Sequence, residues 1–445
     1  MIRRDANRAR RWGGLKRAES MKIRWSVRAG GVLVFAAAVL SAACGGKSDL
    51  NLTPSGLPPL SQASELNSYV GTQGTDPSTG NSGAVWQVTI NHTTNSFSAS
   101  DYAAQLVTAN GLFAFDGGFL NFSQTNPAPA FQADGFTIEI PGRVAFFRPG
   151  FNSFNSTQDT ATSASSPVAM VPGNCLGLFD VTFQFVTLPA AKWTAGTDVA
   201  YGSFQVNSLQ PSSSGTTWNF SNLTQLTLAK TQSQSGATLS DGICAQSVVG
   251  AVVSIPPASA TGNTITVAAG PSGFLIMNNG PNTSGAVGVI QPSSALNTSG
   301  VLSANYLGFI SEPAIPLPLS GVPTANQVAF FGCPSSGCKP SGTTLVGGAY
   351  PNDDPTQPAN TNITINLGAQ NATNNGLYDS ATVTIPDPAN ACTAPGVAGQ
   401  DSQGNPTCAL PAAAVAGNPE NKFAIFLIAE DVVNQSPMAI YLFQE

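Results

Sequence analysis

The sequence has a single histidine, few charged residues and almost no clustered positive charge outside its N-terminal segment. His92 is the only histidine among 445 residues, and Asp, Glu, Lys and Arg together make up 9% of the chain. Zinc sites that need several histidines are therefore excluded, and a Ser-His-Asp or Cys-His catalytic site would have to use His92. Because His92 lies among Thr and Asn residues between two predicted strands, we interpret it as an exposed turn residue.

The few basic residues are concentrated near the N-terminus. Residues 1–43 hold 10 of the 17 Lys and Arg but only 2 of the 23 acids, which leaves 7 basic and 21 acidic residues and a net charge of −14 in residues 44–445. Nucleic-acid binding relies on clustered Lys and Arg, and so does attraction to anionic lipid. We therefore expect no nucleic-acid partner.

The N-terminal segment has the pattern of an export signal. Lys22, Arg24 and Arg28 precede about fifteen mostly apolar residues, fewer than the ~20 that cross a bilayer as a helix. Ala42 and Ala43 then stand immediately before Cys44. This segment resembles a bacterial lipoprotein signal, although Ser41 occupies the place of the usual leucine.

The resemblance implies that residues 21–43 are a signal peptide and that Cys44 carries the lipid that attaches the protein to the membrane. Gly45 stands where a retention aspartate would favour the inner membrane, so the outer membrane of the cell envelope is the expected location. An ordinary secretory signal and an uncleaved anchor are the alternatives. We further expect residues 1–20 to be a mis-called extension before Met21, and residues 44–65, rich in Pro, Gly and Ser, to be a flexible tether.

Six cysteines follow Cys44, namely Cys175, Cys244, Cys333, Cys338, Cys392 and Cys408. An even number in an exported protein indicates disulfides, and six cysteines allow 15 connectivities. Pairing each cysteine with its neighbour along the chain gives 333 with 338 and 392 with 408, and by elimination 175 with 244. The sequence has no CxxC pair that would favour zinc, so we expect neither a metal nor a cofactor.

The composition after the signal predicts an all-β protein. The chain is rich in Gly, Asn, Ser and Thr and poor in Lys, Glu and Arg, and many short segments alternate apolar and polar residues. In residues 84–91, for example, Trp86, Val88 and Ile90 share one face, and the Asp116-Gly117 step is typical of a tight hairpin turn. Trp86, Trp193 and Trp218 are therefore expected in the core.

About eighteen strands at this spacing predict an antiparallel meander that forms barrel or sandwich lobes, with little helix outside the signal peptide. We place one β lobe at residues 66–255 and a second at 256–445, divided at a Pro-rich segment. A single large β domain is the alternative.

Carboxylates are the remaining candidates for catalysis. Glycoside hydrolysis needs only two acids about 5 to 9.5 Å apart, but solvated surface acids are the default interpretation here. The candidates are Glu139, Asp180, Glu312, Glu430 and Asp431. Since no nucleophile elbow occurs and no sequence pattern pairs these acids, we assign no catalytic residue. We expect a non-catalytic binding or surface-structural module with a glycan, small-molecule or protein partner, and an envelope hydrolase acting on glycans is the alternative.

Overall fold

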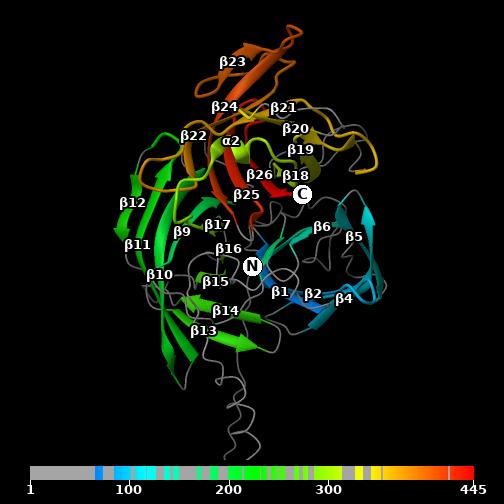
Figure 1. Ribbon diagram of the computed structural model, residues 1–445, viewed down its shortest axis with the longest axis vertical. Helices are drawn as coiled ribbons and strands as arrows, with labels where there is room; N and C mark the ends of the chain where they lie inside the picture. The colour runs from blue at the N-terminus through cyan, green and yellow to red at the C-terminus, as the bar shows by residue number, and fades with distance from the viewer. Residues whose placement is uncertain are drawn as a thin grey trace, which may run out of the picture. The chain divides into compact units, whose positions relative to one another are not determined.

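The computed structural model describes most of the chain after residue 65 and consists almost entirely of strands (Figure 1). The only helix among the described residues is the four-residue α2 (Thr298–Val301). The described ranges are 66–73, 85–101, 106–116, 118–126, 135–140, 144–149, 168–171, 181–188, 199–212, 215–230, 232–237, 242–247, 250–255, 265–269, 274–278, 285–312, 326–333, 342–351, 354–418 and 421–445. The predicted signal, Cys44 and the predicted tether lie outside them.

The first eight strands close into a barrel. Each strand pairs antiparallel with the next, and β8 pairs back with β1, so that Val70 lies opposite Val171. The strands are β1 (Leu66–Gln73), β2 (Val85–Asn91), β3 (Ser96–Asp101), β4 (Leu106–Asp116), β5 (Phe119–Asn126), β6 (Gly135–Ile140), β7 (Val144–Pro149) and β8 (Val168–Val171). The hairpin predicted at Asp116-Gly117 is confirmed by the pairing of Asp116 with Phe119, and Gly118 in its turn has a φ of 88°.

The next nine strands form a second ring of hydrogen-bonded strands. The β10–β11 pairing joins the sheet into a circuit of eight strands, and β12 is attached to β11 outside it. The strands are β9 (Val181–Thr187), β10 (Ala200–Ser212), β11 (Gly215–Thr227), β12 (Gln232–Ala237), β13 (Gly242–Ser247), β14 (Gly250–Ile255), β15 (Ile265–Ala269), β16 (Phe274–Asn278) and β17 (Ala286–Ile290).

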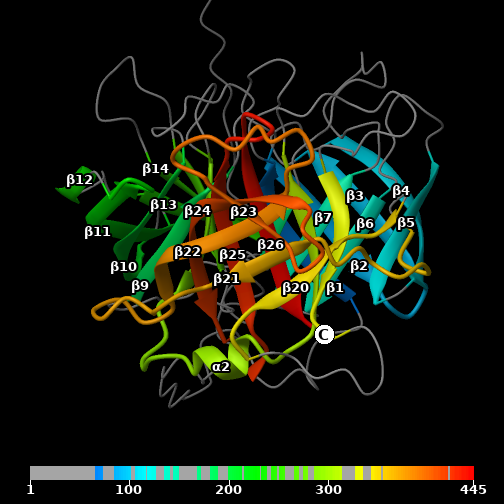
Figure 2. The same cartoon turned by 90° about the horizontal axis from the view of Figure 1, so that it is seen from above.

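The last nine strands repeat this plan. The β22–β24 pairing closes a third circuit of eight strands, and β23 is attached to β24 outside it (Figures 1 and 2). The strands are β18 (Tyr306–Ser311), β19 (Asn326–Phe331), β20 (Leu345–Ala349), β21 (Ile363–Asn366), β22 (Leu377–Pro386), β23 (Val397–Gln400), β24 (Pro406–Gly417), β25 (Ala424–Asp431) and β26 (Ser436–Gln444).

The all-β antiparallel meander predicted from the sequence is confirmed. The proposed lobe boundary at residue 256 falls between β14 and β15, which pair with each other through Val253 and Val267. It therefore lies inside the second ring, where the Pro-rich segment connects two adjacent strands.

Alternation along the strands divides the apolar side chains between ring interiors and outer faces. The interior of the third ring is one buried cluster that includes Tyr306, Tyr378 and Leu427. In the second ring Phe204 contacts Phe183, Phe185 and Phe220, and Trp218 packs on Phe220. The prediction that Trp218 lies in the core is thus confirmed, whereas Trp193 lies outside the described residues.

A separate buried cluster combines outer-face residues of all three rings. The first ring contributes Phe119, the second contributes Val186 and Tyr201, and the third contributes Phe309 and Phe426. Phe119 and Phe309 lie with their ring centroids 6.0 Å apart. The outer faces are therefore apolar where the rings meet, which explains why many strands are buried on both sides.

Candidate functional site

Four polar side chains meet at one end of the first barrel, and we call them the mouth cluster: Asn67, Tyr69, His92 and Glu139. Asn67 and Tyr69 alternate along β1, His92 begins the turn between β2 and β3, and Glu139 lies on β6. In the barrel order β6 is a neighbour of β5 and β7 but not of β1 or β2. The side chains therefore meet across the interior of the barrel rather than along one strand pair.

Glu139 is the centre of this cluster. Its Oε1 accepts hydrogen bonds from Asn67 Nδ2 at 3.1 Å and from the Tyr69 hydroxyl at 2.5 Å, and its Oε2 lies 2.7 Å from His92 Nε2. The side chain of Glu139 is 3% exposed and that of His92 is 25% exposed. A buried carboxylate is stable only with such partners, and here two neutral donors and one imidazole supply them.

The position of His92 raises the pKa of its imidazole above the ordinary 6.5. The hydrogen bond to Glu139 is the largest cause, partial burial acts against it, and the negative charge of Glu139 adds to the increase. The protonated form of His92 is therefore favoured, with the ring donating to the Glu139 carboxylate.

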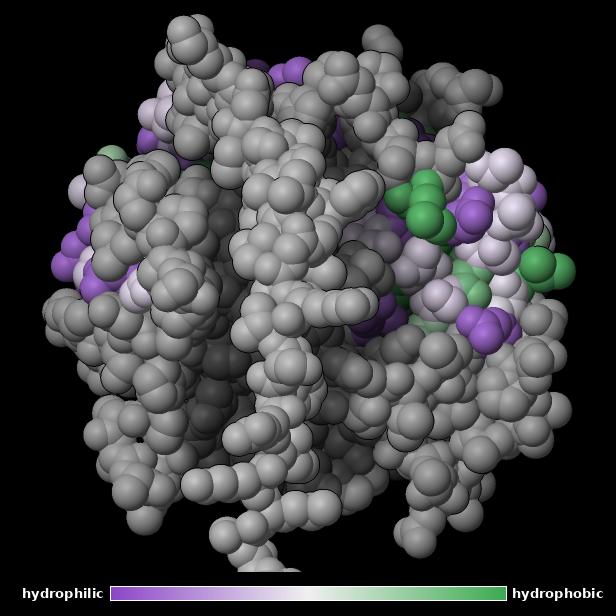
Figure 3. Space-filling model, turned by 90° about the horizontal axis from the view of Figure 1, so that it is seen from below, coloured by the Kyte–Doolittle hydropathy of each residue, from purple (hydrophilic) through white to green (hydrophobic). Residues whose placement is uncertain are grey.

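Aromatic side chains surround His92 at the mouth. The ring of Phe113 meets the imidazole edge-on at 5.5 Å, and Phe115 stacks on it at 6.5 Å while remaining 68% exposed. Deeper in the barrel Phe97 and Phe122 stack at 4.3 Å. On the face of the molecule in Figure 3, exposed hydrophobic side chains stand among hydrophilic ones.

The interior of the first barrel also contains a polar group without a partner. The buried Oγ1 of Thr137, on the same side of β6 as Glu139, has no hydrogen-bond partner in the structure. An apolar wall with a few convergent polar groups is typical of small-molecule sites, and an eight-stranded barrel can hold one small ligand.

These contacts correct two predictions made from the sequence. His92 is not a solvated turn residue, because its ring is partly buried and bonded to Glu139, which is 47 residues away in sequence. Glu139 is not a solvated surface acid, because its carboxylate lies in the barrel mouth. Only the barrel closure brings β6 to the β2–β3 turn, and no local sequence pattern reports that closure.

The third ring contains three further candidate acids, Glu312, Glu430 and Asp431. Glu312 directly follows β18 and Asp431 ends β25, and both strands flank β26. Glu312 is 8% exposed and Asp431 is fully buried. Glu430 is also buried, on the opposite face of β25, so none of these three is the solvated acid that the sequence suggested; Asp180 lies outside the described residues.

The environment of these acids disfavours their charged forms. Burial raises the pKa of Glu312 to about 8, and the nearby negative charge of Asp431 contributes. Burial also raises the pKa of Asp431, although Oδ1 accepts hydrogen bonds from the Val433 and Asn434 amides and Oδ2 accepts one from Asn434 Nδ2. The negative charge of Asp387 adds to this increase.

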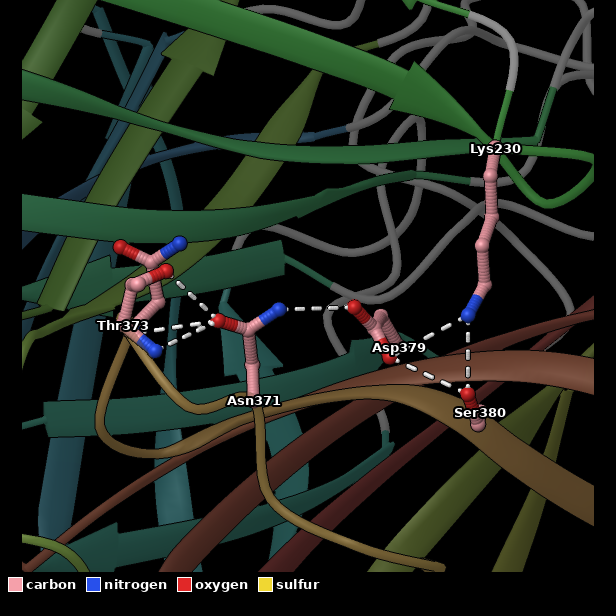
Figure 4. Close-up of polar contacts among 6 residues, drawn as sticks. Lys230, Asn371, Thr373, Asp379 and Ser380 are labelled. Carbon is pink, nitrogen blue, oxygen red and sulfur yellow. Dashed lines mark hydrogen bonds and ion pairs between the residues drawn. The ribbon is translucent and has the colours of Figure 1, made fainter.

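A third polar cluster links the second ring to the third (Figure 4). Lys230, which follows β11, lies 3.5 Å from Asp379 Oδ1 and donates a hydrogen bond to Ser380 Oγ at 3.0 Å. Asn371 Nδ2 donates to Asp379 Oδ2 at 2.8 Å. Burial alone would raise the pKa of Asp379, but these hydrogen bonds and the Lys230 charge lower it overall. All the groups in this cluster are paired with one another, which indicates a structural contact.

One predicted disulfide is confirmed. Cys392 and Cys408 are bonded, with a Cα–Cα distance of 5.5 Å, and they tie the segment before β23 to β24. Cys333 is also disulfide-bonded. Cys175 and Cys338 lie outside the described residues, and Cys244 lies on β13. The pairings of 333 with 338 and of 175 with 244 therefore stay predictions.

Within the described ranges, no three His, Cys, Asp or Glu side chains are grouped so that they could hold a metal ion. No helix in this part of the chain is long and apolar enough to cross a membrane.

Comparisons with known proteins do not assign this chain to a family. No family model matches the chain, and no curated protein matches it significantly. Among solved structures, a mutant of the vaccine antigen transferrin binding protein B from Haemophilus parasuis Hp5 is 8% identical, with a TM-score of 0.22, over 85% of this chain and 75% of that one. Intact Ap-TbpB with its N and C lobes gives 8% identity and a TM-score of 0.20 over 85% and 76%. Likenesses at this level carry no argument about function.

Proposed function

We propose that the protein is a lipid-anchored binding module of the cell envelope and that its binding site is the mouth of the first barrel. The signal pattern that ends at Cys44 supports the anchor, and the Cys392–Cys408 disulfide fits an oxidising compartment outside the cytoplasm. The observation that carries the binding role is the mouth cluster. It combines a buried carboxylate, a partly exposed imidazole and an exposed aromatic ring at one barrel end.

The carboxylate hydrolase is the weaker candidate. Two acids with raised pKa values, Glu312 and Asp431, do lie near each other, as such chemistry would need. Both are buried at the end of a closed ring filled with apolar side chains, however, and a glycan must reach its catalytic acids. The burial of this pair therefore favours the binding module.

The anchor is tested by expressing the full chain in a Gram-negative host with labelled fatty acid. We expect the wild type to incorporate label and to partition into detergent, and Cys44→Ser to lose both properties. Cys392→Ser is the matched control, because it removes a different cysteine and should keep the label. Unlabelled, freely soluble wild type would overturn the proposed anchor.

The binding role is tested against catalysis with ester, peptide and glycoside substrates. We expect no turnover from the wild type or from His92→Ala and Glu312→Gln. A general base or acid contributes a rate factor of about 10² to 10⁴, so turnover that either substitution removes would show that the protein is an enzyme.

A further inference from the structure

The two oxygens of Glu139 have different kinds of partner. Oε1 is held by Asn67 and Tyr69, which are almost fully buried and belong to the barrel wall. Oε2 is bonded to His92, which comes from a turn and is partly exposed. The side of the carboxylate that faces solvent is therefore covered by one imidazole ring.

The ring of His92 can leave this position without unfolding the turn. The turn backbone is held by Asn91, whose Oδ1 accepts hydrogen bonds from the Thr93 and Thr94 amides at 2.9 and 3.1 Å. The imidazole itself is held by Glu139 and by contacts with Phe113 and Phe115. Rotation of the His92 side chain would expose Oε2 between these two aromatic rings.

The chemistry of the exposed position restricts what can replace the imidazole. A buried carboxylate that loses its partner needs another donor, and a cation meets this need best. An anion would be repelled by Glu139, and a small inorganic ion would find only Glu139 and His92, since no three His, Cys, Asp or Glu side chains are grouped in the described residues. The flanking phenylalanine faces attract organic cations and pack on apolar groups.

We propose that the mouth cluster binds small organic ammonium compounds with an apolar or aromatic body. The ammonium group takes the place of His92 at Glu139 Oε2, and the body of the ligand packs on Phe113 and the exposed Phe115. This inference rests on the proposed binding function and adds the class of ligand to it.

The test compares three probes of similar size by calorimetric titration of the purified protein: benzylamine, its neutral analogue benzyl alcohol, and benzyltrimethylammonium. A charge-assisted hydrogen bond in a buried site corresponds to about 10- to 100-fold in affinity, so benzylamine should bind at least tenfold more tightly than the alcohol. The trimethylammonium probe has no N–H donor, and we expect an affinity between the other two.

Substitutions test which residues cause the preference for the amine over the alcohol. Glu139→Gln should remove the advantage of the amine over the alcohol, and Phe115→Leu should weaken all three probes. His92→Ala removes the competing imidazole and should bind benzylamine several-fold more tightly. If His92→Ala does not fold, Phe115→Leu and the wild-type comparison still test the proposal. Asp379→Asn is the matched control, because Asp379 is paired with Lys230 outside the first barrel and should not affect binding.

Equal binding of the amine and the alcohol would overturn the cation site while leaving the binding module intact. An amine preference that persists in Glu139→Gln would also overturn it. If no probe binds, the cation site is wrong, and the labelling and turnover experiments decide the proposed function independently.

Discussion

At the scale of single residues, the described acids that were candidates for catalysis are buried, and their protonation affects the stability of the folded protein. Glu312 is buried in the end of the third ring and has a pKa of about 8, compared with an ordinary 4.5, because of burial and the charge of Asp431. The folded state therefore binds the Glu312 proton more tightly than the unfolded state. The resulting stabilisation is complete below pH 4.5 and is lost as the pH rises through about 8.

We predict that the wild type loses stability between pH 5 and pH 9 relative to Glu312→Gln, which keeps the shape of the side chain but cannot ionise. Each pKa unit corresponds to about 1.4 kcal/mol, so the difference should reach a few kcal/mol. Urea denaturation across this pH range measures it. Glu445→Gln, an exposed position, is the control and should follow the wild type. Parallel curves for the wild type and Glu312→Gln would show that Glu312 is not buried as described.

His92 gives a second prediction at this scale. His92→Ala leaves the Glu139 carboxylate without its Oε2 partner, so the free energy of unfolding should fall by about 1–3 kcal/mol. Since the pKa of His92 is raised, its charged form adds stability below pH 6.5 that disappears as the pH rises through the raised value. Thermal denaturation should therefore show a larger loss at pH 6 than at pH 9. A change below 0.5 kcal/mol, typical of exposed positions, would contradict the observed contact.

At the scale of secondary-structure elements, local patterns predicted much of what was found. Alternation identified strands such as β2, the Asp-Gly step identified the β4–β5 hairpin, and neighbour pairing identified the Cys392–Cys408 bond. These features depend on residues close together in sequence. The closure of each ring pairs strands far apart, such as β1 with β8, and has no local signature, so neither the three rings nor the mouth cluster could be read from the sequence.

A disulfide also acts at the scale of these elements. The Cys392–Cys408 bond holds the segment that carries β23 against β24. Cys408 is fully buried in the interior cluster of the third ring. We predict that the double substitution Cys392→Ser and Cys408→Ser lowers the free energy of unfolding by about 3 kcal/mol, as expected for a loop of this length. Urea denaturation of the oxidised protein measures the effect, and reduction of the wild type should lower the stability at least as much, because it also breaks the disulfide of Cys333. An unchanged midpoint would mean that the segment is held by its strand pairing alone.

At the scale of the whole molecule, the outer-face cluster predicts that the rings unfold together. Phe426 lies in the cluster shared by all three rings, whereas Phe204 lies inside the second ring. Replacing either by alanine should cost about 3–5 kcal/mol. If the rings are coupled, Phe204→Ala should shift the tryptophan-fluorescence and far-ultraviolet circular-dichroism transitions equally. Separate transitions, only one of which moves, would show that the rings are independent.

The pairing of the first strand with the last strand fixes the order in which the three rings can close. In each ring the first strand pairs with the last, as β1 does with β8, β9 with β17 and β18 with β26. In the export that we propose, a chain that emerges from its N-terminus on the far side of the membrane can complete the first ring while the other two are still crossing. The third cannot close before β26 has emerged, and until then the edge of β18 that β26 later covers remains open to other strands. During export this part of the chain therefore has the greatest need of chaperones.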